Sequence, residues 1–207
     1  MLAARLMDYR YENCAVLALS PGGVIVGEAI ARRLHTTLSL LLTSRISAPG
    51  DNSLVLGTID QQGDFTYNNL VSAGQMEDYM ADFRNYLEEE KMHRLYDMTR
   101  IVGEHGLADP ALLIGRHVIL ATDGVKNGLS FDAAYSFLRT IHTAKLIAAV
   151  PVGEISAMER LSEHCDEVQY LYIPDSFMSV GHYYEEPPPQ SSTDILDRID
   201  RVVARWI

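Results

Sequence analysis

Residues His117–Leu138, HVILATDGVKNGLSFDAAYSFL, carry the side chains of this chain that are best placed to do chemistry. An apolar run leads to Asp123, a turn with two glycines follows, and an amphipathic stretch comes after the turn. In a parallel α/β protein such a turn directs its amides and the first free N–H groups of the helix at an anion, whose charge the helix dipole favours. The pattern predicts a phosphate site, with Asp123 at the carboxyl end of a strand, where open α/β sheets bind ligands.

The predicted phosphate-binding residues belong to the turn and to the start of the helix. Glycines permit backbone angles that point successive amides inward, while lysine, asparagine and serine add a charge and side-chain donors. The residues are Gly124, Val125, Lys126, Asn127, Gly128, Leu129 and Ser130. A plain strand–helix turn with Ser130 as the helix N-cap explains the same spacing, because glycine-rich turns are common. The P-loop pattern GxxxxGK[ST] cannot be fitted here.

A second glycine turn, Ser20–Pro21–Gly22–Gly23, follows an apolar run and precedes a helical stretch. Its glycine pair lets the backbone approach an anion at a helix N-terminus. Alone this is a weak signal. Two such turns after two parallel strands favour a ligand with two phosphate groups.

Six short apolar runs are predicted to be strands, and segments of helical spacing lie between several of them. The runs are Ala15–Leu19, Leu38–Leu42, Leu54–Ile59, Val118–Ala121, Leu146–Val150 and Val168–Ile173. Strands that are apolar on both faces and alternate with helices indicate a parallel sheet flanked by helices, so the predicted fold class is α/β. The run Leu54–Ile59 differs, because Gln61–Gln62–Gly63 joins it to the alternating run Gly63–Asn68, which predicts an inserted β-hairpin.

Two further segments are predicted to be helical. Met76–Met98 carries an apolar stripe, and Glu88–Glu90 is interpreted as its solvated face. A C-terminal helix is capped by Ser192 or Thr193, and its apolar stripe consists of Ile195, Ile199, Val202, Val203 and Trp206. Pro187–Pro189 fixes an extended segment before this helix.

Composition and charge narrow the class of protein. A formal net charge of −11, with no basic cluster longer than Arg32–Arg33, argues against a nucleic-acid partner. No apolar run approaches the roughly 18 residues of a membrane span, and the N-terminus lacks a signal core, so a cytoplasmic protein is expected. Cys14 and Cys165 are interpreted as buried packing thiols rather than as a disulfide. No histidine pair has metal-ligand spacing, and no metal ligands are assigned.

The order of motifs along the chain resembles the type I phosphoribosyltransferase family, in particular its bacterial branch of stand-alone proteins. That branch reads roughly VLALPRGGVPVG, RKIGAPGNPELAIG and VILVDDGIATGATM. The corresponding stretches here are VLALSPGGVIVG from Val16, SRISAPGDNSLVLG from Ser44 and VILATDGVKNGLSF from Val118. The tail CDEVQYLYIPDSFMSVGHYYEEPPPQSSTDIL from Cys165 is also similar, so the match covers nearly the whole chain.

The resemblance implies a single domain over residues 1–207, in which a five-stranded parallel core carries a small hood from the N-terminal segment and residues 174–192. It implies a homodimer that binds 5-phosphoribosyl-1-diphosphate with Mg²⁺ and attaches a base or amine at ribose C1 with loss of diphosphate. By resemblance, Asp123 is the catalytic residue, and it binds the ribose hydroxyls together with Thr122. Residues 124–130 then bind the 5′-phosphate, and the diphosphate loop consists of Ser20, Pro21, Gly22, Gly23 and Arg45.

Most departures from the family's pattern fall on ligand-facing positions. Thr122 replaces the first of two adjacent acids, and Pro21 replaces a basic residue before the glycine pair. Lys126–Asn127 replaces Ala-Thr, and Ser44–Arg45 replaces an Arg-Lys pair. The packing positions around them are kept, which indicates a retained fold with an altered site.

A binder of the 5′-phosphate of a nucleotide or phosphoribosyl ligand, with transfer chemistry lost or greatly slowed, is therefore our hypothesis. Hydrogen bonds to charged groups contribute about 1.5–3 kcal/mol against about 1 kcal/mol for neutral ones, so Thr122 weakens ribose binding. Without a basic residue at position 21, the departing diphosphate loses stabilisation. Two alternatives stay open: an active transferase that uses Mg²⁺, and a non-catalytic dimeric scaffold or regulatory subunit.

Pro21 carries a further prediction. Family members hold a cis peptide just before the position of Pro21, and a cis bond costs about 0.5–1 kcal/mol before proline against about 2.5–4 kcal/mol elsewhere. We therefore predict that the Ser20–Pro21 bond is cis. In the tail, His182, Tyr183 and Tyr184 are interpreted as surface or packing residues rather than as catalytic or base-stacking groups.

Overall fold

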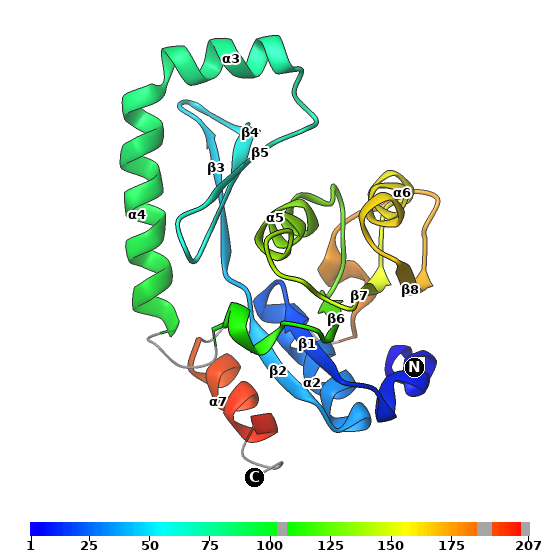
Figure 1. The fold of residues 1–207 in the computed structure, drawn as a ribbon. Coiled ribbons are helices and arrows are strands. Elements are labelled where there is room, and N and C mark those ends of the chain that lie inside the picture. Colours follow the sequence, from blue (N-terminus) through cyan, green and yellow to red (C-terminus); the bar gives the residue numbers. More distant parts are fainter. Residues whose placement is uncertain (103–106, 186–191, 204–207) are drawn as a thin grey trace.

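The computed structural model describes residues 1–102, 107–185 and 192–203 of the 207-residue chain. Within these residues, eight strands form two separate sheets (Figure 1). The strands are β1 (Cys14–Ala18), β2 (Thr37–Leu40), β3 (Thr43–Ala48), β4 (Asp51–Asp60), β5 (Phe65–Tyr67), β6 (His117–Ala121), β7 (Lys145–Val152) and β8 (Glu167–Tyr172). The larger sheet has the order β2-β1-β6-β7-β8, and all of its pairs are parallel. The predicted α/β class is confirmed.

Helices cover both faces of the parallel sheet. The α-helices are α1 (Leu2–Arg5), α2 (Pro21–Leu34), α3 (Ala73–Asp82), α4 (Arg84–Val102), α5 (Leu129–Leu138), α6 (Ile155–His164) and α7 (Ser192–Val203). The short 3₁₀ turns are η1 (Met7–Tyr11), η2 (Pro110–Leu112) and η3 (Val180–Tyr183). The first core cluster joins one face of the sheet to α1, α2 and α7, and the second joins the other face to α5 and α6.

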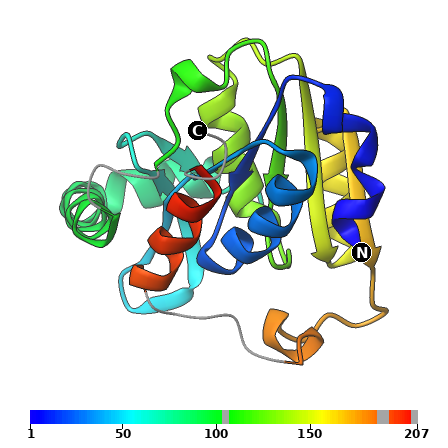
Figure 2. The same cartoon turned by 90° about the horizontal axis from the view of Figure 1, so that it is seen from below.

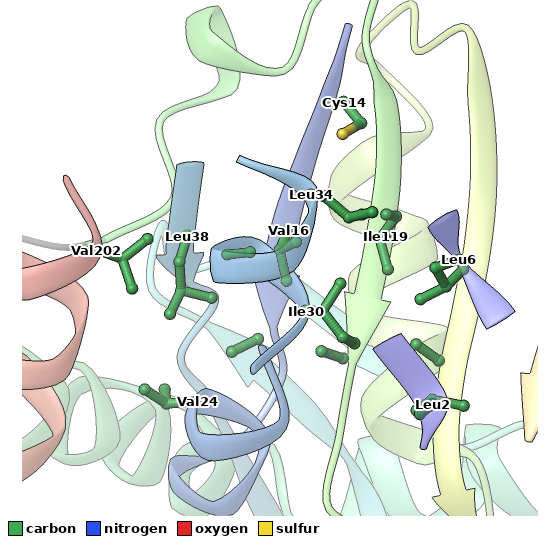
Figure 3. Packing of buried hydrophobic residues seen from close by; sticks show 14 of the residues in the cluster. Leu2, Leu6, Cys14, Val16, Val24, Ile30, Leu34, Leu38, Ile119 and Val202 are labelled. Atoms are coloured by element: carbon green, nitrogen blue, oxygen red, sulfur yellow. The ribbon is translucent and has the colours of Figure 1, made fainter. Parts of the chain in front are cut away.

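The core explains why the central strands β1, β6 and β7 are apolar along most of their length. Val16 pairs with Ile119 and Ile119 with Ile147, and all three side chains are fully buried on the face under α2. Figure 3 shows Ile30 and Leu34 of α2 packed against this layer. Alternate residues of the same strands point at α5 and α6, so neither face tolerates polar side chains.

The smaller sheet is antiparallel and has the order β3-β4-β5. Its β4–β5 pair is the predicted hairpin, and its turn is closed by Asp60, whose Oδ1 accepts from the N–H groups of Gln62 (2.9 Å) and Asp64 (3.0 Å). The structure adds β3, which the sequence did not predict because Thr43, Ser44 and Ser47 interrupt its apolar pattern. The insertion is therefore a three-stranded sheet rather than a hairpin.

Two helices, α3 and α4, replace the single helical stretch predicted over Met76–Met98. Phe83 ends α3 with φ −111° and ψ 18°, and the chain then turns into α4 (Figure 1). Leu87 and Met98 of α4 join the third core cluster with the buried side chains of β3 and β4. Glu88 and Glu89 are exposed, as predicted, whereas Glu90 is half-buried and forms an ion pair with Arg94 (3.0 Å).

The C-terminal helix α7 confirms its predicted stripe where the side chains are described. Ile195, Ile199 and Val202 are buried in the first core cluster, and Figure 2 shows α7 lying beside α2. The predictions for Ser192 and Thr193 as caps, for Val203 and Trp206 in the stripe and for Pro187–Pro189 lie outside the described residues and side chains.

The N-terminal segment packs on the parallel sheet. Leu2, Leu6 and Tyr9 belong to the first core cluster, beside α2 and the end of the sheet at β8. Cys14 and Cys165 are free thiols, and burial raises the pKa of both, that of Cys165 to about 12, which fits their predicted packing role. None of the described helices has the length and apolar composition that crossing a membrane would require.

Candidate functional site

Two turns lie side by side at the carboxyl ends of neighbouring strands. Residues 20–23 follow β1 and residues 123–130 follow β6, and the last residues of the two strands, Ala18 and Ala121, are register partners. The N–H of Leu19 extends the pairing by donating to the carbonyl of Ala121 (2.9 Å). The structure thus brings both predicted anion-binding turns to the edge at which open α/β sheets bind ligands.

Ser20 is the N-cap of α2 and connects the two turns. Its Oγ accepts from the N–H of Gly23 (2.8 Å) and donates to Oδ1 of Asp123 (2.8 Å). The predicted cis Ser20–Pro21 bond is wrong, since no peptide bond within the described residues is cis. Pro21 is the first residue of α2, a position where the fixed φ of proline suits the helix and its missing N–H leaves no donor unpaired.

Gly22 and Gly23 are packed against the second turn. A β-carbon on Gly22 would lie 2.1 Å from Oδ2 of Asp123, and one on Gly23 would lie 2.6 Å from the carbonyl oxygen of Ala121. The binding of a ligand's anion by the glycine pair stays a prediction, but the absence of a side chain at Gly22 does allow an anion to approach closely. In this structure that anion is the protein's own carboxylate, placed at the N-terminus of α2, where the helix dipole favours it.

Thr122 is buried and bonds within its own turn. Its Oγ1 donates to the carbonyl of Gly124 (3.2 Å) and lies 3.4 Å from the N–H of the same residue. The tail lies over this part of the site. The hydroxyl of Tyr184 donates to the carbonyl of Asp123 (2.6 Å), and burial, with the nearby charge of Asp123, raises the pKa of Tyr184 to about 12.

The tail residues fit the predicted packing and surface roles. Tyr184 is half-buried on the turn, His182 is exposed, and Val180 approaches Gly124 so closely that a β-carbon there would lie 3.0 Å from its methyl group. The sequence pattern did not indicate that Tyr184 would hold the backbone of Asp123. A tyrosine in a loop carries no local signal for a partner 61 residues away.

The backbone amides of the second turn fall into two sets. The N–H of Val125 donates to the carbonyl of Val152 (3.0 Å), so this amide extends the sheet and is not available to a ligand. The N–H groups of Lys126, Asn127 and Gly128 have no partner among the described residues. These amides precede α5, whose dipole adds to the positive potential of the turn.

Helix α5 begins two residues earlier than it would with Ser130 as its N-cap. Gly128 is the N-cap with φ +76°, a conformation that favours glycine, and its carbonyl accepts from the N–H groups of Phe131 (2.9 Å) and Asp132 (3.0 Å). Ser130 is the second residue of the helix, so the alternative interpretation in which Ser130 is the N-cap of a plain strand–helix turn is wrong on this point. The amide of Leu129 is only weakly engaged, 3.4 Å from Oδ1 of Asn127.

Arg45 comes to this turn from the other sheet. A small pocket of about 30 Å³ is lined by Arg45, Thr122 and residues 124–131. The guanidinium of Arg45 and the ammonium of Lys126 have no hydrogen-bonding or ion-pair partner among the described residues. The sequence grouped Arg45 with the predicted diphosphate loop, whereas the structure places it beside the turn after β6.

One further basic residue near the turn was not predicted. Arg160 of α6 forms an ion pair with Asp132 of α5 and lies against Gly128. Nothing in the sequence around Arg160 indicates that this residue lies near the turn. Among the residues that the structure describes, no group of three or more His, Cys, Asp or Glu side chains could hold a metal ion.

Comparison with known proteins gives matches over most of the chain. The profile of the family described as "Phosphoribosyl transferase domain" matches residues 1–185. Two curated proteins of Mycobacterium tuberculosis, each named "Putative phosphoribosyl transferase", are 27% identical over 201 residues, which is 97% of this chain. The match covers 44% of each relative, so the chain spans less than half of their length.

A solved structure of similar sequence has the same fold. The crystal structure of TT1426 from Thermus thermophilus superposes with a TM-score of 0.68 at 29% identity. The alignment covers 96% of this chain and 92% of the other.

Proposed function

This chain belongs to the phosphoribosyl transferase domain family, and from that premise we propose that it binds the 5′-phosphate of a nucleotide or phosphoribosyl ligand, with transfer chemistry lost or greatly slowed. The observation that carries the proposal is the difference between the two turns. The turn after β6 presents unpaired amides and two unpaired cations among the described residues, while the turn after β1 is closed by the carboxylate of Asp123.

The turn after β6 has the chemistry of a phosphate site. Amides of residues 126–128 and the N-terminus of α5 offer donors and a favourable dipole, and backbone donors survive side-chain substitution. Arg45 and Lys126 add two positive charges beside it, in a chain whose formal net charge is −11. In the described part of the chain, these two cations have no partner, and neither do the backbone N–H groups beside them. Such a group of unpaired donors and positive charges favours the binding of an external anion.

The turn after β1 supports the loss of transfer chemistry. Diphosphate bound at Gly22 would meet the carboxylate of Asp123, whose oxygen lies where a β-carbon of that glycine would be. Pro21 supplies no charge to offset this repulsion. Electrostatic stabilisation of developing charge is usually the largest contribution to catalysis, so a turn without a cation supports departure of diphosphate poorly.

Magnesium has a place in this proposal only if transfer persists. Mg²⁺ at phosphate sites is usually held by one or two carboxylates together with phosphates of the substrate. Asp123 fits that description in chemistry, although its Oδ1 already accepts from Ser20 and its neighbour is Thr122 rather than a second acid. If it holds the ion, Asp123 supplies one carboxylate ligand, and the ion neutralises charge on the diphosphate.

Calorimetric titration tests the proposal. We expect AMP and ribose 5-phosphate to bind with an affinity that does not depend on magnesium. Arg45→Gln and Lys126→Gln should each weaken this binding about tenfold or more, since a hydrogen bond to a charged group contributes about 1.5–3 kcal/mol and about 1.4 kcal/mol is tenfold. Arg139→Gln removes the same charge from the opposite end of α5 and should leave the affinity unchanged.

Two results would replace the proposal with one of its alternatives. Magnesium-dependent binding of 5-phosphoribosyl-1-diphosphate, followed by release of diphosphate with any common base, would establish an active transferase that uses Asp123. Absence of binding for all three phosphate compounds would favour a scaffold that keeps only the fold.

A further inference from the structure

Arg160 and Asp132 form an ion pair beside the turn after β6, residues 123–130, which we call the phosphate turn. Asp132 lies in the first turn of α5 and is 6% exposed, and Arg160 reaches it from α6 with a side chain that is only 20% exposed. The two residues are 28 positions apart, so the pair joins two helices rather than stabilising one.

The same guanidinium lies against the N-cap of α5. A β-carbon on Gly128 would be 3.7 Å from Nε of Arg160 and 3.9 Å from its Cδ. Gly128 is the last of the three residues whose N–H groups have no partner among the described residues, and with φ +76° it joins this run to α5. Arg160 thus lies beside the residue that joins the unpaired amides to α5.

The charge of Arg160 lies close to the N-terminus of α5, where Asp132 is its ion-pair partner. A cation near the N-terminus of a helix opposes the helix dipole, and burying an ion pair removes both partners from water. Asp132 offsets the charge of Arg160 inside the protein. An anion in the adjacent turn would add a second counter-charge, which removes the remaining disadvantage of a cation at this position.

We propose that Arg160 is a positioning residue for the phosphate turn, held by Asp132 so that it fixes the orientation of Gly128 and adds positive potential behind the unpaired amides. The inference rests on the proposed function and deepens it, because it adds to the phosphate site a basic residue from α6 that is held in place by its ion pair with Asp132. Arg45 and Lys126 line the pocket themselves, whereas Arg160 acts through the backbone.

The test compares two variants that treat charge and geometry differently. The double variant Asp132→Asn/Arg160→Gln removes both charges but leaves two amide side chains able to hydrogen bond, so neither partner is left as an unpaired buried charge. Arg160→Lys keeps the charge and loses the planar fork. We expect ribose 5-phosphate to bind about tenfold more weakly to the double variant, which is the size of loss typical for residues that hold the direct contacts of a site in place. Arg160→Lys should bind ribose 5-phosphate more tightly than the double variant and more weakly than the wild-type protein.

A readout without ligand separates this inference from the proposed function. In the ligand-free protein the amide chemical shifts of residues 126–130 should move in the double variant and stay in place in Arg139→Gln, the matched control at the other end of α5. Wild-type affinity and unchanged shifts in a folded double variant would overturn the role of Arg160. If the wild-type protein fails to bind ribose 5-phosphate, the proposed function fails, and the ligand-free shifts still decide whether Arg160 positions the turn.

Discussion

Asp123 and Gly22 meet where the two turns touch, and this single contact makes the turns different. The carboxylate accepts from Ser20 and lies over the first glycine, so the N-terminus of α2 already has an anion. The amides of residues 126–128 have no such partner among the described residues. The direction of the Asp123 side chain therefore determines which turn keeps amides without a partner among the described residues.

A substitution at Gly22 tests the contact directly. In Gly22→Ala the new β-carbon would overlap Oδ2 of Asp123, so the carboxylate must rotate away and release Ser20. Inserting an atom into a packed site costs about 1–3 kcal/mol. We expect a loss of that size in the free energy of unfolding, measured by urea denaturation.

Gly74→Ala is the matched control for this prediction. Gly74 lies in α3, and a β-carbon there would meet nothing within 4 Å. Alanine in place of a helical glycine should stabilise by about 0.5–1 kcal/mol. A neutral or stabilising effect of Gly22→Ala would show that the contact with Asp123 is not maintained in solution.

At the scale of secondary-structure elements, a polar network fastens the N-terminal segment to two strands. Nζ of Lys145 in β7 donates to Tyr9 in η1 and to Glu167 in β8, each at 2.6 Å. Burial acts to raise the pKa of Glu167, but hydrogen bonds from Lys145, Tyr9 and Gln169 outweigh it and lower the pKa to about 2. This network lies at the amino ends of the strands, away from the two turns.

The lowered pKa of Glu167 predicts how stability depends on pH. Its folded pKa is below the ordinary value of 4.5, so its contribution is present above pH 4.5 and is lost as the pH falls toward 2. Glu167→Gln should cost about 1 kcal/mol near neutral pH and flatten the decline of stability in acid. The measurement is the urea midpoint at a series of pH values from neutral down to about one pH unit above the folded pKa.

A control separates Glu167 from carboxylates in general. Glu163 is exposed near the end of α6, so Glu163→Gln should keep the pH dependence of the wild-type protein. If both variants reduce the loss of stability in acid equally, the change in net charge explains the result, and the network of Glu167 makes no specific contribution.

At the scale of the whole molecule, the antiparallel insertion has its own core and joins the parallel core through few elements. Ile46, Leu56, Ile59, Leu87 and Met98 form a cluster separate from the two clusters of the parallel sheet. The insertion packs on α5 through β4 and β5, and it carries Arg45 on β3 (Figure 1). The candidate site is therefore lined by residues of both the parallel core and the antiparallel insertion.

A phosphate ligand that contacts both parts should couple them. We expect ribose 5-phosphate to slow amide hydrogen exchange at residues 126–130 and also along β3, because opening either part would break contacts to the ligand. In Arg45→Gln the protection should be confined to the turn. Protection that never reaches β3 in the wild-type protein would show that Arg45 does not contact the phosphate. Strand β8, on the far edge of the parallel sheet, serves as the internal control.

The sequence alone was enough to predict the class of fold, the five parallel strands, the hairpin, helix α7 and the two turns. These features have local causes: a strand buried on both faces is apolar throughout, and a glycine turn before a helix depends on neighbouring residues. Motif order was enough to indicate the family. Homodimerisation, cytoplasmic location and the ligand remain predictions.

Only the tertiary structure decided which groups face each other across the site. Ser20 forms a hydrogen bond with the carboxylate of Asp123, 103 residues away. Arg45 of β3 lies beside the turn after β6, and Arg160 of α6 lies beside Gly128 in the same turn. Strand β3 escaped prediction because its polar residues are held by pairing with β4 rather than by an apolar pattern. Local periodicity in the sequence determines where helices and strands form. Which side chains face each other between these elements depends on how the elements pack together, and the residues next to each side chain in the sequence give no information about this.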